Sequence, residues 1–211
     1  MTGVQTCALP ICAQPQPIDD IRPPIEKGIA LLKDPRYTRQ GQFEAQREKI
    51  WETIRDIFDF RIISMMALAM EWRSFTPKQQ DEFVEAFTEL LKNNYLNKIQ
   101  GQFHDEEVVF LGQDILNEKR AIVKSKVLRQ QIEIPMDYKV AFTRGRWRIY
   151  DINIEGISLI QNYRTQFKSI LAKESPDQLI RRIRDKNIEE TPDGKPNARL
   201  RGPGIRTASS T

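Results

Sequence analysis

The chain has 211 residues, of which 39% are hydrophobic and 29% are charged, an ordinary balance for one globular domain with polar ends. Its formal net charge of +4 is concentrated in residues 176–211, which hold eight Lys or Arg against five Asp or Glu. The rest of the chain is close to neutral. This distribution argues against nucleic acid as a partner, because nucleic-acid binders concentrate positive charge on the folded body.

The composition predicts three regions. Residues 1–17 are interpreted as a non-native or truncated export segment, because no Lys or Arg precedes their apolar residues as in a complete signal peptide. Residues 18–187 are expected to form a single domain. Residues 188–211 are rich in Pro, Gly and polar residues without periodicity, which predicts a disordered tail. Both cysteines, Cys7 and Cys12, lie in the first region, so no disulfide framework or metal site is expected in the domain.

The first half of the domain has apolar residues at helical spacing. Helices are predicted over Ile21–Lys33, Phe43–Phe58 and Ile62–Met70. The apolar run Ile62–Met70 falls well short of the about 18 residues that a membrane-spanning helix needs. It is therefore interpreted as a buried helix.

The strongest helix signal begins at Thr76. Thr76 suits the N-cap, Pro77 the first helical position, and Gln79 the reciprocal position of a capping box. The helix is expected to run to about Ile99 and to be stopped by Gly101.

From residue 107 the apolar period changes from 3.6 to 2, which predicts strands joined by short polar turns. Short turns between consecutive strands indicate an antiparallel meander. The predicted fold is α+β: a four-stranded twisted antiparallel sheet with N-terminal and C-terminal helices packed on it. The strands are Val108–Leu116, Ala121–Ile132, Ile134–Thr143 and Trp147–Ile154, and the last helices are Ser158–Ala172 and one from Ser175 to about Lys186.

Few residues carry the chemistry of catalysis. His104 is the only histidine and is interpreted as a solvated loop residue. Phosphate-cradling glycine loops and zinc-ligand spacings do not occur in the sequence. Asp151 and Glu155 could form an acid–base couple. The favoured interpretation is structural, with Asp151 paired to Arg148 or Arg164 and Glu155 shaping the corner before the next helix.

The run Arg181–Arg184 is interpreted as a solvated helix face. A contact with an anionic membrane surface is the alternative.

Large apolar side chains occur both on the helix after Thr76 and on the facing strands. They either fill a solid core or line a ligand cavity. Periodicity alone does not separate these two arrangements, because both place apolar residues on the same face.

Residues Trp147 to Phe167, WRIYDINIEGISLIQNYRTQF, resemble the signature of the MlaC family, also called toluene-tolerance or phospholipid-binding ABC-transporter auxiliary proteins. A second block between Phe58 and Tyr95, which includes Thr76-Pro77, agrees with the same family. The resemblance covers about residues 20–187, and departures are confined to the ends.

The resemblance implies a periplasmic phospholipid carrier of Gram-negative bacteria. Such a carrier works as a monomer between an outer-membrane lipoprotein–porin complex and an inner-membrane ABC transporter with an MCE ring. It uses no cofactor, and phospholipid is its cargo. The cavity between sheet and helices would hold the acyl chains. The candidate lipid-binding residues are Phe60, Met66, Phe83, Phe87, Leu91, Tyr95, Phe110, Val123, Val127, Met136, Tyr138, Val140, Trp147, Ile149, Ile154, Ile157, Leu159, Tyr163 and Phe167.

Two other classes remain open from the residues alone. One is an isomerase or dehydratase on a cone-shaped α+β scaffold, which requires a polar acid–base pair inside the pocket. The other is an interaction module with a solid core. The scarcity of acid–base candidates favours a protein that is not an enzyme.

Overall fold

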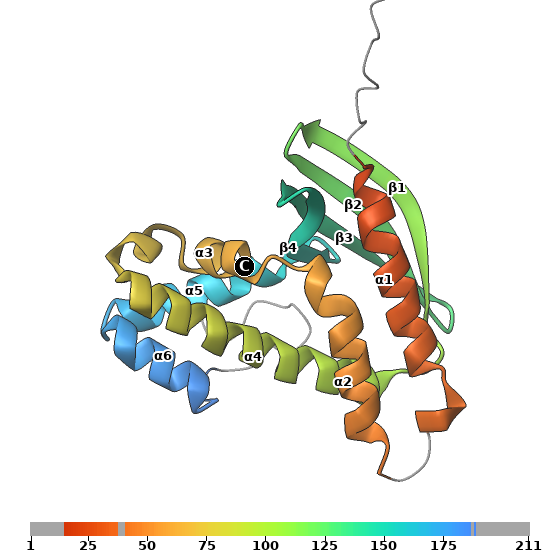
Figure 1. Cartoon of the computed structure of the whole chain (residues 1–211), viewed down its shortest axis with the longest axis horizontal. Coiled ribbons are helices and arrows are strands. Elements are labelled where there is room, and N and C mark those ends of the chain that lie inside the picture. Colours follow the sequence, from red (N-terminus) through yellow and green to blue (C-terminus); the bar gives the residue numbers. More distant parts are fainter. Residues whose placement is uncertain (1–14, 38–40, 187, 189–211) are drawn as a thin grey trace, which may run out of the picture.

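The computed structural model describes residues 15–37, 41–186 and 188, and it has the expected α+β arrangement (Figure 1). The expected tail lies outside the described residues except for Ile188, and the expected export segment lies outside them except for residues 15–17. The helices are α1 (Pro17–Leu32), α2 (Phe43–Ile54), α3 (Phe60–Leu68), α4 (Pro77–Gln102), α5 (Leu159–Leu171) and α6 (Pro176–Arg184), with 3-10 turns η1 (Pro35–Tyr37), η2 (Arg55–Ile57) and η3 (Ala69–Ser74). The strands are β1 (Glu107–Asn117), β2 (Arg120–Arg129), β3 (Ile132–Thr143), β4 (Arg146–Ile154) and β5 (Ile157–Ser158).

The sheet is an antiparallel meander in the order β1-β2-β3-β4-β5. Its turn between β3 and β4 is the pair Arg144-Gly145, where both residues have positive φ, as a two-residue hairpin of matching twist requires. The sequence predicted four strands, and the sheet has five. The fifth strand, Ile157–Ser158, has only two residues, so it is too short to produce a period-two pattern.

One strand boundary differs from the prediction. Ile132 was assigned to the second strand, but β2 ends at Arg129 and Ile132 begins β3. The chain turns at Gln130, which has a φ of 54°. Gln is not a typical residue for that conformation, so the turn left no signal in the sequence.

Helix α4 starts as predicted, with reciprocal capping between Thr76 and Gln79. It continues through Gly101 to Gln102, beyond the predicted end. Gly101 does not adopt a positive φ, and a glycine ends a helix only when its backbone turns into the left-handed region.

Two apolar cores hold the fold together. The first lies among α3, η3, α4, α5 and α6 and contains buried Phe83, Phe87 and Phe167. The second lies between α1 and the sheet and contains Ile21, Val123 and Val140. Figure 1 shows α1 lying across the sheet, while α4 runs from the first core toward α2. The region between these two cores is bounded by helices on one side and strands on the other.

Candidate functional site

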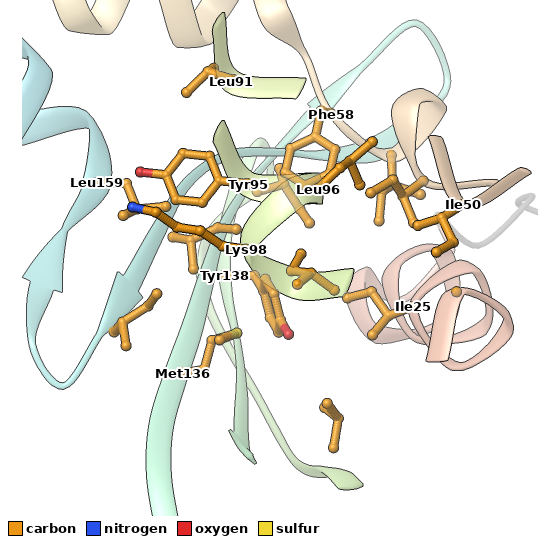
Figure 2. A pocket seen from close by; sticks show the side chains of 18 of the residues that line it. Ile25, Ile50, Phe58, Leu91, Tyr95, Leu96, Lys98, Met136, Tyr138 and Leu159 are labelled. Carbon is orange, nitrogen blue, oxygen red and sulfur yellow. The ribbon is translucent and has the colours of Figure 1, made fainter. Parts of the chain in front are cut away.

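A cavity of about 480 Å³ lies between the two cores. Figure 2 shows side chains from α1, α2, α4 and the sheet converging on it. Its wall is almost entirely apolar. The volume falls in the range of about 300–1,000 Å³ that is typical of small-molecule sites. The apolar and aromatic lining residues are Ile25, Ile29, Leu32, Ile50, Trp51, Ile54, Ile57, Phe58, Phe60, Ile63, Leu91, Tyr95, Leu96, Ile99, Phe103, Val108, Val127, Ile134, Met136, Tyr138, Ile149, Tyr150, Ile152, Ile154, Leu159 and Ile160.

Gly28 allows α1 and α2 to pack closely together at the cavity. It is buried, it lines the cavity, and a Cβ added to it would lie 3.3 Å from Cγ2 of Ile54. The absence of a side chain lets the two helices approach each other while leaving the space beside them open.

Nine of the nineteen candidate residues lie in the cavity wall. They come from α3, α4, β2, β3, β4 and the start of α5, so segments far apart in the sequence meet here. These nine are Phe60, Leu91, Tyr95, Val127, Met136, Tyr138, Ile149, Ile154 and Leu159. Their contact with lipid stays a prediction.

Five candidates belong to the helical core and not to the cavity wall. The rings of Phe87 and Phe167 lie 5.2 Å apart and those of Phe87 and Tyr163 lie 5.0 Å apart, both edge to face. Phe83 joins the same cluster and Met66 packs against it. Their position has a geometric reason: α4 buries Phe83 and Phe87 against α5, and the residues of α4 that line the cavity lie in its C-terminal half.

The other five candidates outside the wall lie in or near the sheet. Val123, Val140 and Trp147 are buried in the core beneath α1, and Phe110 packs against that core. Ile157 lies in β5 and is half-buried. Alternation along a strand correctly identifies the inner face of the sheet, but it does not tell which part of that face α1 covers.

Helices α1 and α2 also contribute to the cavity wall, although none of their residues is among the sequence candidates. Ile25, Ile29 and Leu32 on α1, together with Ile50 and Ile54 on α2, line the cavity. Their spacing of three or four residues was visible as an apolar stripe, which was interpreted only as a helix signal.

Polar groups at the cavity are few. In Figure 2 the Tyr95 hydroxyl and the Lys98 amine lie toward Leu159. Glu106 and Arg129, also in the wall, form an ion pair of 3.2 Å. Tyr138 is 4% exposed, and its burial raises the pKa of its hydroxyl to about 12, so the ring is neutral at physiological pH.

Asp151 is held by three groups. Its Oδ2 accepts hydrogen bonds from Nζ of Lys139 at 2.9 Å and from Oγ of Ser158 at 2.7 Å, and its Oδ1 accepts one from the backbone amide of Ile160 at 3.2 Å. The predicted pairing with an arginine was wrong, because the register of β3 and β4 places Lys139 directly opposite Asp151.

The remaining residues of the acid–base hypothesis also have structural positions. Arg164 donates two hydrogen bonds to the backbone oxygen of Met66, at 2.9 and 2.7 Å. Glu155 has a φ of 50°, and its amide donates to the carbonyl of Pro135 at the corner after β4. This position agrees with the predicted role of Glu155 in shaping the corner.

Two further sequence candidates lie apart from the cavity wall. His104 is exposed, and its Nδ1 lies 2.6 Å from the backbone oxygen of Gln102. Arg181, Arg182 and Arg184 are exposed on α6, where Arg182 pairs with Glu174. Within the described ranges, no group of three or more His, Cys, Asp or Glu could hold a metal ion, and no helix is long and apolar enough to cross a membrane.

The chain is similar to known proteins over most of its length. Residues 24–185 match the family described as MlaC protein. Among solved structures, a phospholipid-binding protein from Ralstonia solanacearum, solved in complex with a phospholipid, matches with a TM-score of 0.72 and 22% sequence identity. The match covers 82% of this chain and 97% of the Ralstonia chain. At this identity the likeness shows a shared fold.

Proposed function

The chain belongs to the MlaC family, and from this premise we propose that it is a periplasmic phospholipid carrier that holds acyl chains in the cavity. MlaC proteins are lipid-binding carriers and not enzymes. The observation that carries the proposal is the apolar cavity of about 480 Å³ between α1, α2, α4 and the sheet. The Ralstonia protein of the same fold, solved with a phospholipid, supports it.

The energetics of burial suit this cargo. Removing a 16-carbon chain from water is worth on the order of 13 kcal/mol, at about 0.8 kcal/mol for each methylene. An apolar wall supplies this gain without a specific polar contact. The headgroup, which gains nothing from such a wall, stays largely outside.

Release of the lipid requires a free-energy cost that opposes the gain from burying its acyl chains. Full burial of two chains would exceed the strongest affinities that proteins reach, near 18–21 kcal/mol. We propose that the empty cavity partly collapses, so that opening it for lipid costs free energy. Hydrogen exchange tests this point: the amides of α1 and α2 should exchange at different rates in lipid-free and lipid-bound protein, and identical rates and thermal stability would contradict it.

The enzyme alternative has less support from the cavity. An isomerase or dehydratase needs a carboxyl or imidazole that is free to move a proton. Asp151 lies at the wall, but Lys139, Ser158 and the amide of Ile160 hold its oxygens. His104 is not part of the wall.

We further propose that the carrier acts as a monomer that exchanges lipid with an outer-membrane lipoprotein–porin complex and an inner-membrane ABC transporter with an MCE ring. Membership of the MlaC family supports these partners.

Native mass spectrometry of the protein purified from a bacterial periplasm tests the carrier function. A co-purified mass equal to a phospholipid is expected, and protein that carries none after gentle purification contradicts the proposal. Val127 and Leu128 provide a matched pair of variants, because they are adjacent on β2 and only Val127 lines the cavity. Val127→Glu should lose the lipid, since it puts a charge in an apolar wall, while Leu128→Glu should keep it.

A further inference from the structure

Two arginines and an alanine form a row across the sheet on the face opposite α1. Arg120 of β2 is paired with Ala141 of β3, and Ala141 is paired with Arg148 of β4. The neighbouring residues Ala121 and Val140 are buried in the core beneath α1. Because side chains alternate along a strand, Arg120, Ala141 and Arg148 point to the other face of the sheet.

The small side chain of Ala141 lets the Arg120 side chain cross β3. The Arg120 guanidinium carbon lies 4.4 Å from the centroid of the Tyr150 ring, and Tyr150 is on β4, two residues after Arg148. Ala141 itself is only 3% exposed. The guanidinium group of Arg120 therefore lies next to the strand that carries the second arginine, stacked on an aromatic ring.

The lysines on this part of the sheet have acidic partners, and these two arginines do not. Lys124 pairs with Asp114 at 2.5 Å and Lys126 pairs with Glu133 at 2.7 Å. Over the described residues, no carboxylate lies within ion-pair distance of Arg120 or Arg148.

Both arginines also carry a buried donor without an acceptor. Nη1 of Arg120 and Nε of Arg148 are buried and have no hydrogen-bond partner in the described structure. A buried N–H that makes no hydrogen bond is costly, and for a charged group the cost is larger. Arg120 and Arg148 lie in one row two strands apart, so both add positive charge to the same face of the sheet. A bound anion would compensate this charge and supply acceptors to the two guanidinium groups.

We propose that Arg120 and Arg148 form a binding site for a phosphate group on this face of the sheet. A guanidinium presents a planar fork of donors, and a tetrahedral phosphate has enough oxygens to accept from two forks at once. A phosphate dianion also offsets more of the positive charge of the two arginines than a carboxylate, which carries a single negative charge. Tyr150 holds one fork in place. Tyr150 also lines the cavity, but neither arginine does, and the phosphate site does not depend on the carrier function.

Titration calorimetry with inorganic phosphate, at constant ionic strength set with chloride, tests the site. Saturable binding is expected for the wild type, and Arg120→Gln or Arg148→Gln should weaken it about tenfold or more, because each removes charged hydrogen bonds. Arg146→Gln is the matched control, since Arg146 is an exposed residue of the same strand. Arg120→Lys keeps the charge but not the fork, so it should restore only part of the affinity.

The phosphate-dependent rise in melting temperature provides a second readout. The melting temperature of each variant is compared with and without phosphate, so a general loss of stability is not mistaken for a loss of binding. Absence of phosphate binding by the wild type, or equal binding by wild type, Arg148→Gln and Arg146→Gln, would overturn the site.

Two further arms identify the source of the phosphate. Flotation with phosphatidylglycerol vesicles that depends on Arg120 and Arg148 supports a lipid headgroup, whereas phosphate binding without flotation supports a free phosphate. Binding of polyglutamate in place of phosphate would overturn the assignment in favour of an acidic protein partner.

Discussion

The carboxylate of Asp151 lies 2.9 Å from the ammonium nitrogen of Lys139, and the contact joins two neighbouring strands beside the start of α5. Asp151 is 7% exposed. Its other oxygen accepts from the amide of Ile160, one of the free donors of the first helical turn. Asp151 thus connects β3, β4 and α5, which makes it a structural residue at the edge of the cavity.

Replacing Asp151 with Asn should therefore lower stability and leave lipid binding intact. The change removes the charged partner of Lys139 and weakens the helix contact, and we expect a loss of roughly 2 kcal/mol in the free energy of unfolding. Urea denaturation measures this loss. Native mass spectrometry of the folded fraction should still find lipid.

Asp137→Asn is the matched control for this variant. Asp137 lies on the neighbouring strand β3 and is not part of the cavity wall. Its replacement should change the stability little. An Asp151→Asn protein that is as stable as wild type but has lost lipid would contradict the structural role.

The aromatic cluster of the helical core should also separate stability from lipid binding. Phe87 is fully buried and contacts Tyr163 and Phe167. Phe87→Leu should lower the free energy of unfolding by roughly 1–2 kcal/mol, because the smaller side chain leaves unfilled volume. The lipid content per folded molecule should not change, since the residue lies outside the cavity wall.

Leu91→Ala on the same helix should have the opposite pattern, with a smaller effect on stability and a larger effect on lipid binding than Phe87→Leu. Leu91 lines the cavity, so its truncation enlarges existing space. It should cost less stability than Phe87→Leu and should alter lipid retention. A loss of lipid by Phe87→Leu equal to that of Leu91→Ala would show that the helical core responds to the cargo.

The sequence predicted the order and type of the long elements because their signals are local. The capping box at Thr76 and the alternation along the strands require only neighbouring residues. The two-residue strand β5 and the turn at Gln130 have no comparable local signal.

The cavity wall was harder to predict, because it depends on how separate elements are spaced. Phe83 and Tyr95 lie on the same helix, yet the first fills a solid core and the second faces open space. The partner of Asp151 was missed for a related reason. Strand register, rather than the preference of carboxylates for arginine, placed Lys139 opposite it.

Gly28 provides a variant that closes the cavity without unfolding the protein. Gly28→Leu should direct a side chain into the space that Gly28 lines, and the added Cβ meets only the side chain of Ile54. Leu favours a helix over Gly by about 1 kcal/mol, which offsets part of the crowding. We expect the retained lipid to fall severalfold while stability changes little.

Ala30→Leu, on the exposed face of the same helix, is the control for this experiment. It should keep the wild-type amount of lipid in native mass spectra. Full retention of lipid by Gly28→Leu would contradict the position of the acyl chain beside α1.

The buried hydroxyl of Tyr138 makes stability depend on alkaline pH. Its pKa is about 12 in the folded protein because burial disfavours the charged form. An exposed tyrosine in the unfolded chain has a pKa of about 10. Between these values the unfolded state binds fewer protons than the folded state, so stability is fully present below pH 10 and falls as the pH rises toward 12. The loss from this group at pH 11 is about 1.4 kcal/mol.

Urea denaturation of wild type and Tyr138→Phe at pH 9 and pH 11 measures this contribution. Other groups that ionise in this range are common to both proteins, so their difference isolates Tyr138. The wild type should lose about 1.4 kcal/mol more than the variant between the two pH values. Equal losses would mean that the Tyr138 hydroxyl ionises as easily in the folded protein as in the unfolded chain, so that the cavity wall around it is open to water.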